Sequence, residues 1–474
     1  MAFSPRPIIR KTRTAHAPPP YNKSLETIQI IGAGLAGCEA AWQAAEAGVR
    51  VILHEMRPQR LTPAHKTGAF GELVCSNSLK SELVHSAPWL LKQEMRRMGS
   101  LLMRAAETAR VPGGHALTVD RSVFSDEITR ALETHPRIEI RRAEVTAIPP
   151  DGISVIATGP LTSDALAHEI SRFTGAERLY FYDSISPIVA ADSVDMSIAF
   201  RASRYGKSID QSDDYINCPF TREQYEAFVT ALLESESYEP HIAEDRTPYF
   251  EGCLPIEEIA RRGRDTLRFG PMKPVGLVNP YTGRRPWAVV QLRQEDQRAG
   301  SYNLVGFQNH MKFGDQARVM RMIPGLEEAE FLRFGQMHRN TYINAPSLLL
   351  ATLQLRAEPR LFFAGQICGV EGYAESIATG LLAGRFAAAM AHGWPIAPPP
   401  RASALGSLCH YITQTAARNF QPANITFDLL PSLDEEAQTR MRHDKNARRA
   451  EVCRRSAEAF EEYLVGAGRE TVVG

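Results

Sequence analysis

Runs of apolar residues at the start of the chain alternate with a stretch of helical spacing. Residues 27–31 form a short apolar run of strand length. A glycine-rich loop and an alanine-rich stretch follow, and Gly48 is placed to end the helix that this stretch predicts. A second apolar run covers residues 49–54 and leads into Glu55. Strand, helix and strand in this order predict a βαβ unit.

Apolar spacing predicts further helices and strands in the following segment. Helical periodicity returns over residues 79–109, and a second helix is predicted from Ser125, a suitable N-cap, to Leu132. Residues 138–145 and 152–157 have the composition of strands. These elements predict that the α/β pattern of the opening unit continues.

The pattern changes near residue 186 and returns near residue 338. Residues 187–337 carry many turns, few long helices, and clustered arginine and aromatic residues, which predicts an inserted α+β domain. After it, an apolar run at residues 361–364 leads through Gly365 and Gln366 into a helix rich in small residues. A charged helix is predicted over residues 434–464.

Composition narrows the class of protein. The chain has 474 residues, of which 44% are hydrophobic and 23% are charged, as in an ordinary soluble globular protein. No apolar run approaches the roughly 18 residues of a membrane helix. The formal net charge is zero, so a nucleic-acid substrate would have to meet local basic patches. Seven cysteines at irregular spacing, without a CxxC pair, argue against zinc and for reduced thiols in a cytoplasmic protein.

The glycine loop predicts a dinucleotide-binding site. Its residues are Gly32, Ala33, Gly34, Leu35, Ala36 and Gly37. The first glycine permits a tight turn, the second allows the backbone to approach a pyrophosphate, and the third allows strand and helix to pack closely. The helix N-terminus adds amide donors and a positive dipole end. Glu55 ends the second strand, where an acid can bond ribose hydroxyls.

The late segment favours FAD over NAD as the dinucleotide. Phe363, Ala364, Gly365 and Gln366 form a strand end, a glycine and a polar residue before the small-residue helix, which suits a second approach to the flavin end. The predicted fold is therefore α/β: a Rossmann-like, glutathione-reductase-like FAD-binding domain that an inserted α+β domain interrupts. We assign residues 27–186 and 338–474 to the FAD-binding domain, with C-terminal helices in the second part, and residues 187–337 to the inserted substrate domain. Residues 1–26 are predicted to be a disordered basic arm.

Two cysteines are candidates for chemistry. Cys75 precedes the helix predicted from residue 79, and Cys253 precedes a helix start at Pro255. A thiol at a helix N-terminus has a lowered pKa, so a larger fraction is thiolate. A structural role is the alternative for both, and Cys218 lacks even this argument.

Several longer strings resemble one family. They are residues 32–37, 62–65, 72–79, 250–257, 363–366 and 369–376. The chain resembles the TrmFO family of folate- and FAD-dependent tRNA (uracil-5-)-methyltransferases from about residue 27 to the C-terminal region. The strings around Cys75 and Cys253 are more specific than the glycine loop. The resemblance implies methylation of C5 of uridine 54 in the tRNA T-loop. The carbon would come from 5,10-methylenetetrahydrofolate, and NAD(P)H would reduce the FAD.

The resemblance also implies roles for individual residues. Cys253 would be the nucleophile, and Cys75 would lie beside the flavin. His310 resembles a folate-side position, with domain packing as its alternative. Arg339 and Asn340 match another family string, with a role at the domain junction as their alternative. Many relatives have a second histidine after His65, where this chain has Lys66, Thr67 and Gly68.

RNA contact would require basic patches on a neutral protein. Three candidates are Arg261, Arg262 and Arg264; Arg284 and Arg285; and Lys445, Arg448, Arg449, Arg454 and Arg455. The competing functions are the same chemistry on ribosomal RNA, a small-molecule FAD oxidoreductase, the longer MnmG family acting on the wobble uridine, and a non-catalytic RNA-interaction protein. The oligomeric state is not readable from the sequence.

Overall fold

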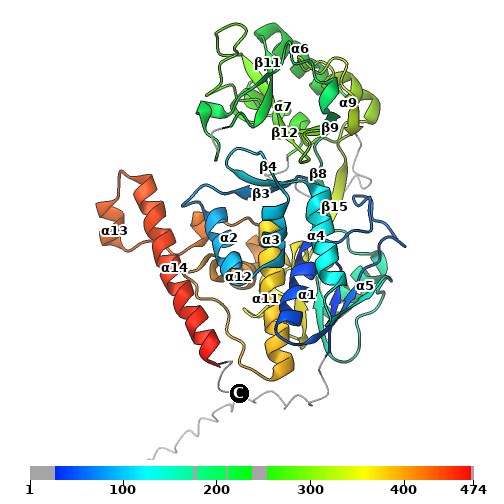
Figure 1. The fold of residues 1–474 in the computed structure, drawn as a ribbon, viewed down its shortest axis with the longest axis vertical. Helices are drawn as coiled ribbons and strands as arrows, with labels where there is room; N and C mark the ends of the chain where they lie inside the picture. The colour runs from blue at the N-terminus through cyan, green and yellow to red at the C-terminus, as the bar shows by residue number, and fades with distance from the viewer. Residues whose placement is uncertain (1–26, 175–178, 210–211, 238–253, 471–474) are drawn as a thin grey trace, which may run out of the picture.

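The computed structural model describes residues 27–174, 179–209, 212–237 and 254–470. Two layered bodies lie one above the other in Figure 1, and the polypeptide runs from the lower body to the upper one and back. The predicted N-terminal arm lies outside the described residues. In the described part of the chain, no helix combines the length and the apolar character that a membrane crossing needs.

A six-stranded sheet forms the centre of the lower body. Its strand order is β16-β17-β7-β1-β2-β6. The bounds are Thr27–Ile31 for β1, Arg50–His54 for β2, Ile138–Arg141 for β6, Ile153–Ile156 for β7, Gln354–Leu355 for β16 and Glu358–Phe363 for β17. All neighbours are parallel except β16 and β17. Strands from both ends of the chain thus share one sheet, and the predicted βαβ unit is confirmed.

Helices cover this sheet and bury one large apolar core. They are α1 (Leu35–Glu46), α3 (Leu101–Thr108), α4 (Arg121–Glu133), α5 (Asp164–Thr174) and α11 (Tyr373–His392). Helices α1 and α11 run side by side with their small residues in contact (Figure 1). A Cβ added at Gly380 would lie 2.2 Å from the Ala36 carbonyl oxygen, and one at Gly384 would lie 2.4 Å from the Ala40 oxygen. The glycines therefore set the distance between the two helices.

A second sheet forms the upper body, with its own apolar core. Its order is β10-β11-β12-β13-β9-β14, and its pairs are antiparallel. The bounds are Ile188–Ala190 for β9, Phe200–Arg201 for β10, Tyr215–Phe220 for β11, Ala288–Gln294 for β12, Ser301–Leu304 for β13 and Phe331–Arg333 for β14. Helices α6 (Arg222–Leu233), α7 (Ile256–Arg261), α8 (Thr266–Phe269) and α9 (Phe313–Met320) pack around it.

Two small sheets lie between the bodies. Strands β8 (Leu179–Ser184) and β15 (Met337–Tyr342) pair antiparallel where the chain enters and leaves the upper body. Strands β3 (Ser78–Ser81), β4 (Arg110–Val111) and β5 (Ala116–Val119) form the other sheet, directly below the upper body (Figure 1). The site described below lies at this boundary.

The helix predicted over residues 79–109 is wrong in its first part and interrupted later. Residues 78–81 form β3, and the helical part is split into α2 (Ala87–Arg97) and α3. The buried Lys92 ammonium donates to the carbonyls of Leu79, Lys80 and Ser81, so these carbonyls do not accept helical amides. Gly99, with φ of +73°, breaks the second part, and Ser100 caps α3.

Two other predicted boundaries shift. Helix α4 begins at Arg121 because Asp120 accepts hydrogen bonds from the Ser122 and Val123 amides, so Ser125 is inside the helix and does not cap it. The predicted tail helix is two helices, α13 (Glu435–Arg440) and α14 (Lys445–Glu470), which lie along one edge of the lower body (Figure 1). The break falls at residues 441–444, where Asp444 accepts from the Ala447 amide.

Candidate functional site

The glycine loop connects β1 to α1. Two of its glycines have no room for a side chain, and the third, Gly34, does. Gly32 has φ of +100°, and a Cβ there would lie 2.7 Å from the Ala157 carbonyl oxygen. A Cβ at Gly37 would lie 1.7 Å from the Gly32 oxygen. A Cβ at Gly34 would meet nothing within 4 Å. The loop is therefore packed against the sheet on one side and open at Gly34 on the other.

The open side of the loop faces a pocket of about 970 Å³, part of which is open to solvent. Gly34 is the N-cap of α1 and provides no side-chain cap, so the first amides of the helix have no intrahelical acceptor and no capping side chain. Of the predicted cofactor residues, those lining the pocket are Gly32, Gly34, Leu35, Ala36, Glu55, Gly365 and Gln366. Ala33 and Gly37 do not line the pocket, and Ala33 is fully buried. The fold thus brings the early loop and the late segment to one cavity.

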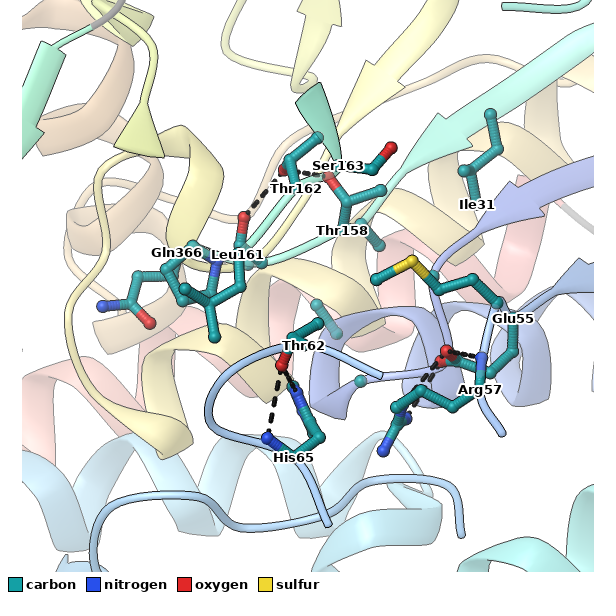
Figure 2. Close-up of a pocket in the computed structure, with 18 of the residues that line it drawn as sticks. Ile31, Glu55, Arg57, Thr62, His65, Thr158, Leu161, Thr162, Ser163 and Gln366 are labelled. Carbon is teal, nitrogen blue, oxygen red and sulfur yellow. Dashed lines mark hydrogen bonds and ion pairs between the residues drawn. The ribbon is translucent and has the colours of Figure 1, made fainter. Parts of the chain in front are cut away.

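Glu55 closes one end of the pocket, and its partner is Arg57 (Figure 2). Glu55 is 5% exposed and accepts from the Ala33 amide at 3.0 Å and from three nitrogens of Arg57 at 2.9 to 3.0 Å. Arg57 also pairs with Glu72 at 3.0 Å. Burial alone would raise the pKa of Glu55, but the hydrogen bonds and charge of Arg57 lower it below its usual range. Glu55 is therefore a carboxylate held in one orientation.

Polar side chains from loops line other parts of the pocket. Thr62 Oγ1 and His65 Nδ1 lie 2.6 Å apart, and Thr158 and Thr162 are joined through their hydroxyls at 2.7 Å (Figure 2). Gly365 has φ of +83°, and its amide donates to Thr379 Oγ1 at 2.8 Å. A Cβ at Gly365 would lie 2.8 Å from the Ala36 Cβ. This glycine permits the late segment to approach α1.

Cys75 lies beside the pocket but not at a helix N-terminus, so the predicted helix-dipole effect is wrong. The residues after it enter β3, for the reason given above. The hydroxyl of Tyr373, which lines the pocket, accepts from the Cys75 amide at 2.8 Å and from the Ser76 amide at 3.2 Å. Cys75 itself is partly exposed. Tyr373 therefore connects the cavity to the cysteine.

Arginines surround Cys75 in place of the helix dipole. Arg121 donates to the Cys75 carbonyl at 3.1 Å and pairs with Glu295 at 2.5 Å. Arg293 donates to Ser76 Oγ at 2.8 Å. A thiolate at Cys75 would interact with these two guanidinium groups and with that of Arg333. Cations beside a thiol favour its thiolate form.

Two of these arginines have buried nitrogens without a hydrogen-bond partner in the described structure. They are Nε of Arg293 and both Nε and Nη2 of Arg333. Burial lowers the pKa of each of these two guanidinium groups. Unpaired buried cationic donors are costly and point to an anionic ligand. No local sequence pattern indicates this cluster, because its members lie on α4, β12 and β14.

Cys253 lies outside the described residues, so its predicted place before a helix can be described only from residue 254 onward. Helix α7 begins at Ile256 with Pro255 as its N-cap. Glu257 on this helix accepts from the His310 amide at 2.9 Å, and its Oε1 lies 3.7 Å from His310 Nδ1. Burial raises the pKa of Glu257 to about 7 and lowers that of His310. The structure thus places His310 beside the helix that follows Cys253, and His310 does not line the pocket.

The remaining candidates are buried or lie at the junction. Cys218 on β11 is fully buried, and this burial raises the pKa of its thiol well above the usual range, so it remains a neutral thiol. Arg339 and Asn340 lie on β15, opposite Tyr182 and Phe181 of β8. Asn340 is 2% exposed. The two β15 residues therefore stand where the two bodies join.

Sheet order, glycine loop and pocket define the class of protein: a Rossmann-like FAD-binding fold that an inserted domain interrupts. A solved structure with this fold is GidA of Aquifex aeolicus in its form II crystal, at a TM-score of 0.67 and 16% identity, covering 92% of this chain and 73% of that one. The predicted fold class is confirmed. At that identity the likeness concerns the fold alone.

Sequence comparisons give the family. The model of the family described as "GIDA: Glucose inhibited division protein A" matches residues 27–395. The methylenetetrahydrofolate--tRNA-(uracil-5-)-methyltransferase TrmFO of Solibacter usitatus is 66% identical over 436 residues, which is 92% of this chain and 98% of that protein. The TrmFO of Koribacter versatilis is 62% identical, with the same coverage. The chain belongs to the GidA family and, within it, to the TrmFO family, which confirms the resemblance seen in the sequence.

Proposed function

We propose that this protein methylates C5 of uridine 54 in the T-loop of tRNA. The carbon comes from 5,10-methylenetetrahydrofolate, and FAD that NAD(P)H has reduced supplies the electrons. The observation that carries the proposal is identity of 62–66% over almost the whole length of relatives named for folate-dependent tRNA (uracil-5-) methylation. The protein acts in the cytoplasm, where tRNA and reduced folate are both present.

The residues of the pocket suit FAD. The open Gly34 face and the uncapped first turn of α1 would hold the pyrophosphate, and the fixed carboxylate of Glu55 would accept from the ribose hydroxyls. Gly365 and Gln366 would approach the cofactor from another part of the pocket wall. When bound, FAD supplies the two electrons that reduce a one-carbon unit from the methylene to the methyl level.

Uracil C5 becomes reactive only after a nucleophile has added to C6. We assign that nucleophile to Cys253: its thiolate adds at C6, and the resulting enolate bonds through C5 to the folate-borne carbon. Loss of the C5 proton and cleavage of the bond to folate then release tetrahydrofolate and leave an exocyclic methylene on C5. A hydride from bound reduced FAD would convert this methylene to the methyl group, and release of the Cys253 thiolate from C6 restores the uracil ring. Cys75 supports the site from beside the flavin.

The arginines around Cys75 have two roles in this proposal. Arg121 holds the backbone on both sides of Cys75, through the Leu73 carbonyl at 2.6 Å and the Cys75 carbonyl at 3.1 Å. The unpaired nitrogens of Arg293 and Arg333 are donors for an anionic group of a substrate, such as a folate carboxylate or an RNA phosphate. His310, Arg339 and Asn340 remain candidates for folate or tRNA contacts.

The test is a methylation assay with purified protein, labelled methylenetetrahydrofolate and NADH or NADPH. Unmodified tRNA should gain label at uridine 54, and a transcript with cytidine at that position should not. Ribosomal RNA in place of tRNA tests the same chemistry on another acceptor. Label that comes from S-adenosylmethionine would exclude the proposal.

Two variants separate the roles of the cysteines. Cys253→Ala should retain FAD and lose methyl transfer, whereas Cys75→Ala should change both transfer and the absorption spectrum of bound FAD. Cys218→Ala is the matched control, since its buried neutral thiol has no part in the reaction. Normal turnover by Cys253→Ala would remove that residue from its role.

A further inference from the structure

Two segments of the upper body join to form one continuous surface. They are residues 196–207 and 273–285, and we call their shared surface the aromatic–basic face. The Tyr205 amide donates to the Gly276 carbonyl at 2.8 Å, and Arg204 Nη1 donates to the Val275 carbonyl at 3.1 Å. At the other end, the Tyr281 hydroxyl donates to the Met196 carbonyl at 2.7 Å.

Large apolar and aromatic side chains are exposed on this face. Tyr205 is 63% exposed, Val278 is 61% exposed and Tyr281 is 58% exposed. The Tyr205 ring lies on the Gly276 backbone, because a Cβ added at Gly276 would be 2.8 Å from two ring carbons. The Lys207 ammonium lies 5.7 Å from the centroid of the same ring. Tyr205 has φ of +59°, a costly conformation for a bulky residue, and such conformations concentrate at functional sites.

The same face has an excess of positive charge. No acidic residue occurs between Asp195 and Asp210 or between Asp265 and Glu295. The exposed cations of the two segments are Arg201, which donates to the Tyr302 hydroxyl, and Lys207, Lys273, Arg284 and Arg285. In the described part of the chain, none of the last four forms an ion pair. The chain as a whole is neutral, so this charge is a local feature.

In each of the other two basic patches, some arginines are paired with nearby acids. Arg261 pairs with Glu258, and Arg264 pairs with Glu226 at 3.2 Å. On the tail helix α14, Arg454 is held between Glu451 and Glu458. Of the three patches, the one containing Arg284 and Arg285 therefore combines unpaired charge with exposed rings.

We propose that the aromatic–basic face binds RNA, with an unstacked base on the exposed Tyr205 ring and phosphates on Lys207, Lys273, Arg284 and Arg285. Aromatic rings between unpaired cations suit single-stranded or looped RNA, because every base has a face that stacks and every nucleotide carries a phosphate. This inference rests on the proposed function, in which tRNA is the substrate. It adds the surface that holds the loop.

The face is placed to deliver RNA to the site. Arg204 Nε donates to Gln291 Oε1 at 2.9 Å, and Gln291 lies on β12 two residues before Arg293. Arg293 contacts Ser76, next to Cys75. These contacts connect the face, through Gln291 and β12, to the arginines around Cys75.

Binding of an unmodified tRNA transcript to the FAD-loaded protein tests the proposal, measured by filter binding over a range of salt concentrations. Tyr205→Ala should weaken binding about 10-fold and raise the KM for tRNA by a similar factor, with kcat changed less than about twofold. Tyr205→Phe retains the ring and should bind like the unchanged protein. Lys207→Gln combined with Arg284→Gln should lower the slope of log Kd against log salt by about 0.7 to 0.9 for each lost phosphate contact.

Arg356→Gln is the matched control, since Arg356 is an exposed cation on the lower body, away from the face. If the unchanged protein methylates tRNA and all face variants keep its Kd, KM and salt slope, the inference is wrong and the proposed function stands. If the unchanged protein does not methylate tRNA, the proposed function fails first. Should Tyr205→Ala fold poorly, the Lys207 and Arg284 variants decide the question, because both side chains are exposed. The proposal would also be overturned if these variants bound tRNA normally but no longer bound a protein partner of the unchanged protein.

Discussion

Arg57 illustrates at the scale of one residue how the acidic end of the pocket is maintained. It is 2% exposed and bonded to Glu55 and Glu72. A buried carboxylate is stable only with partners that compensate for lost water. The orientation of Glu55 therefore depends on a residue that sequence reasoning did not select.

Replacing Arg57 should cost both stability and cofactor. Arg57→Ala leaves Glu55 buried and unpaired, so we expect the free energy of unfolding to fall by about 3–5 kcal/mol and FAD to be lost during purification. Denaturant unfolding and flavin absorbance measure the two effects. Arg60→Ala is the control, since Arg60 forms an exposed ion pair with Glu144 and should change stability by less than about 1 kcal/mol. Equal effects of the two changes would contradict the prediction.

Glu94 should make stability depend on pH. It accepts from the Ala404 and Leu405 amides and from Ser456, and burial raises its pKa to about 7. A carboxyl with a raised folded pKa binds its proton more tightly in the folded state. The contribution of Glu94 to the free energy of unfolding is therefore full below about pH 4.5, and it is lost as the pH rises through about 7.

The shift corresponds to about 3 kcal/mol at about 1.4 kcal/mol per pKa unit. Unfolding of the unchanged protein and of Glu94→Gln at pH 5.5 and pH 8 measures it. The unchanged protein should lose more stability between these two pH values than the variant does. The same loss in both proteins would show that Glu94 does not titrate in this range.

At the scale of elements, one glycine at the start of α1 and one on α11 have different roles: one faces the pocket, and the other permits close helix packing. Gly380 sets the contact between the helices, whereas Gly34 leaves an open face toward the pocket. Gly380→Ala should therefore lower the free energy of unfolding by about 1–3 kcal/mol through overpacking. Gly34→Ala should leave the melting temperature of the FAD-free protein almost unchanged and weaken FAD binding at least 10-fold.

Calorimetry of the FAD-free protein and flavin titration measure the two properties. Each variant is the control for the other, because both add one methyl group. A loss of stability in Gly34→Ala, or unchanged FAD affinity in that variant, would contradict the assigned duties.

Elements also show where periodicity misleads. The apolar spacing over residues 79–109 is compatible with one helix, yet Lys92 binds three carbonyls of residues 79–81 and Gly99 breaks the remainder. A buried ammonium on α2 is a tertiary contact, so no local pattern could indicate it. Because residues 78–81 form a strand, no helix begins directly after Cys75, and no helix dipole acts on its thiol. The positive charge near Cys75 comes from arginines instead.

At the scale of the whole molecule, polar contacts connect the two bodies. Asn77 donates to the Gln294 carbonyl at 2.8 Å, and the Gly114 amide donates to Asp214 at 2.6 Å. The Tyr215 hydroxyl donates to the Gly113 carbonyl at 2.9 Å. Among the described residues, the two bodies have separate apolar cores, and these hydrogen bonds join one body to the other.

Removing one such contact should loosen the junction without unfolding either core. Asp214→Ala leaves the Gly114 amide without its acceptor, at a cost of about 1–3 kcal/mol. Amide hydrogen exchange should become faster around residues 113–116 and 214–216. Asp213→Ala is the control, because Asp213 accepts from the Ser203 amide, a contact within the upper body. Unchanged exchange in Asp214→Ala would show that this contact does not hold the junction.

The sequence by itself determined the opening βαβ unit, the dinucleotide loop and the family. These follow from constraints that are local: Gly32 and Gly37 have no room for a side chain, and the apolar runs on either side are strand-length. Only the tertiary structure decided that Gly365 meets Ala36 in one pocket and that arginines from α4, β12 and β14 surround Cys75. The physical reason is that steric limits act between neighbours along the chain, whereas charge and burial depend on residues that folding brings together from distant segments.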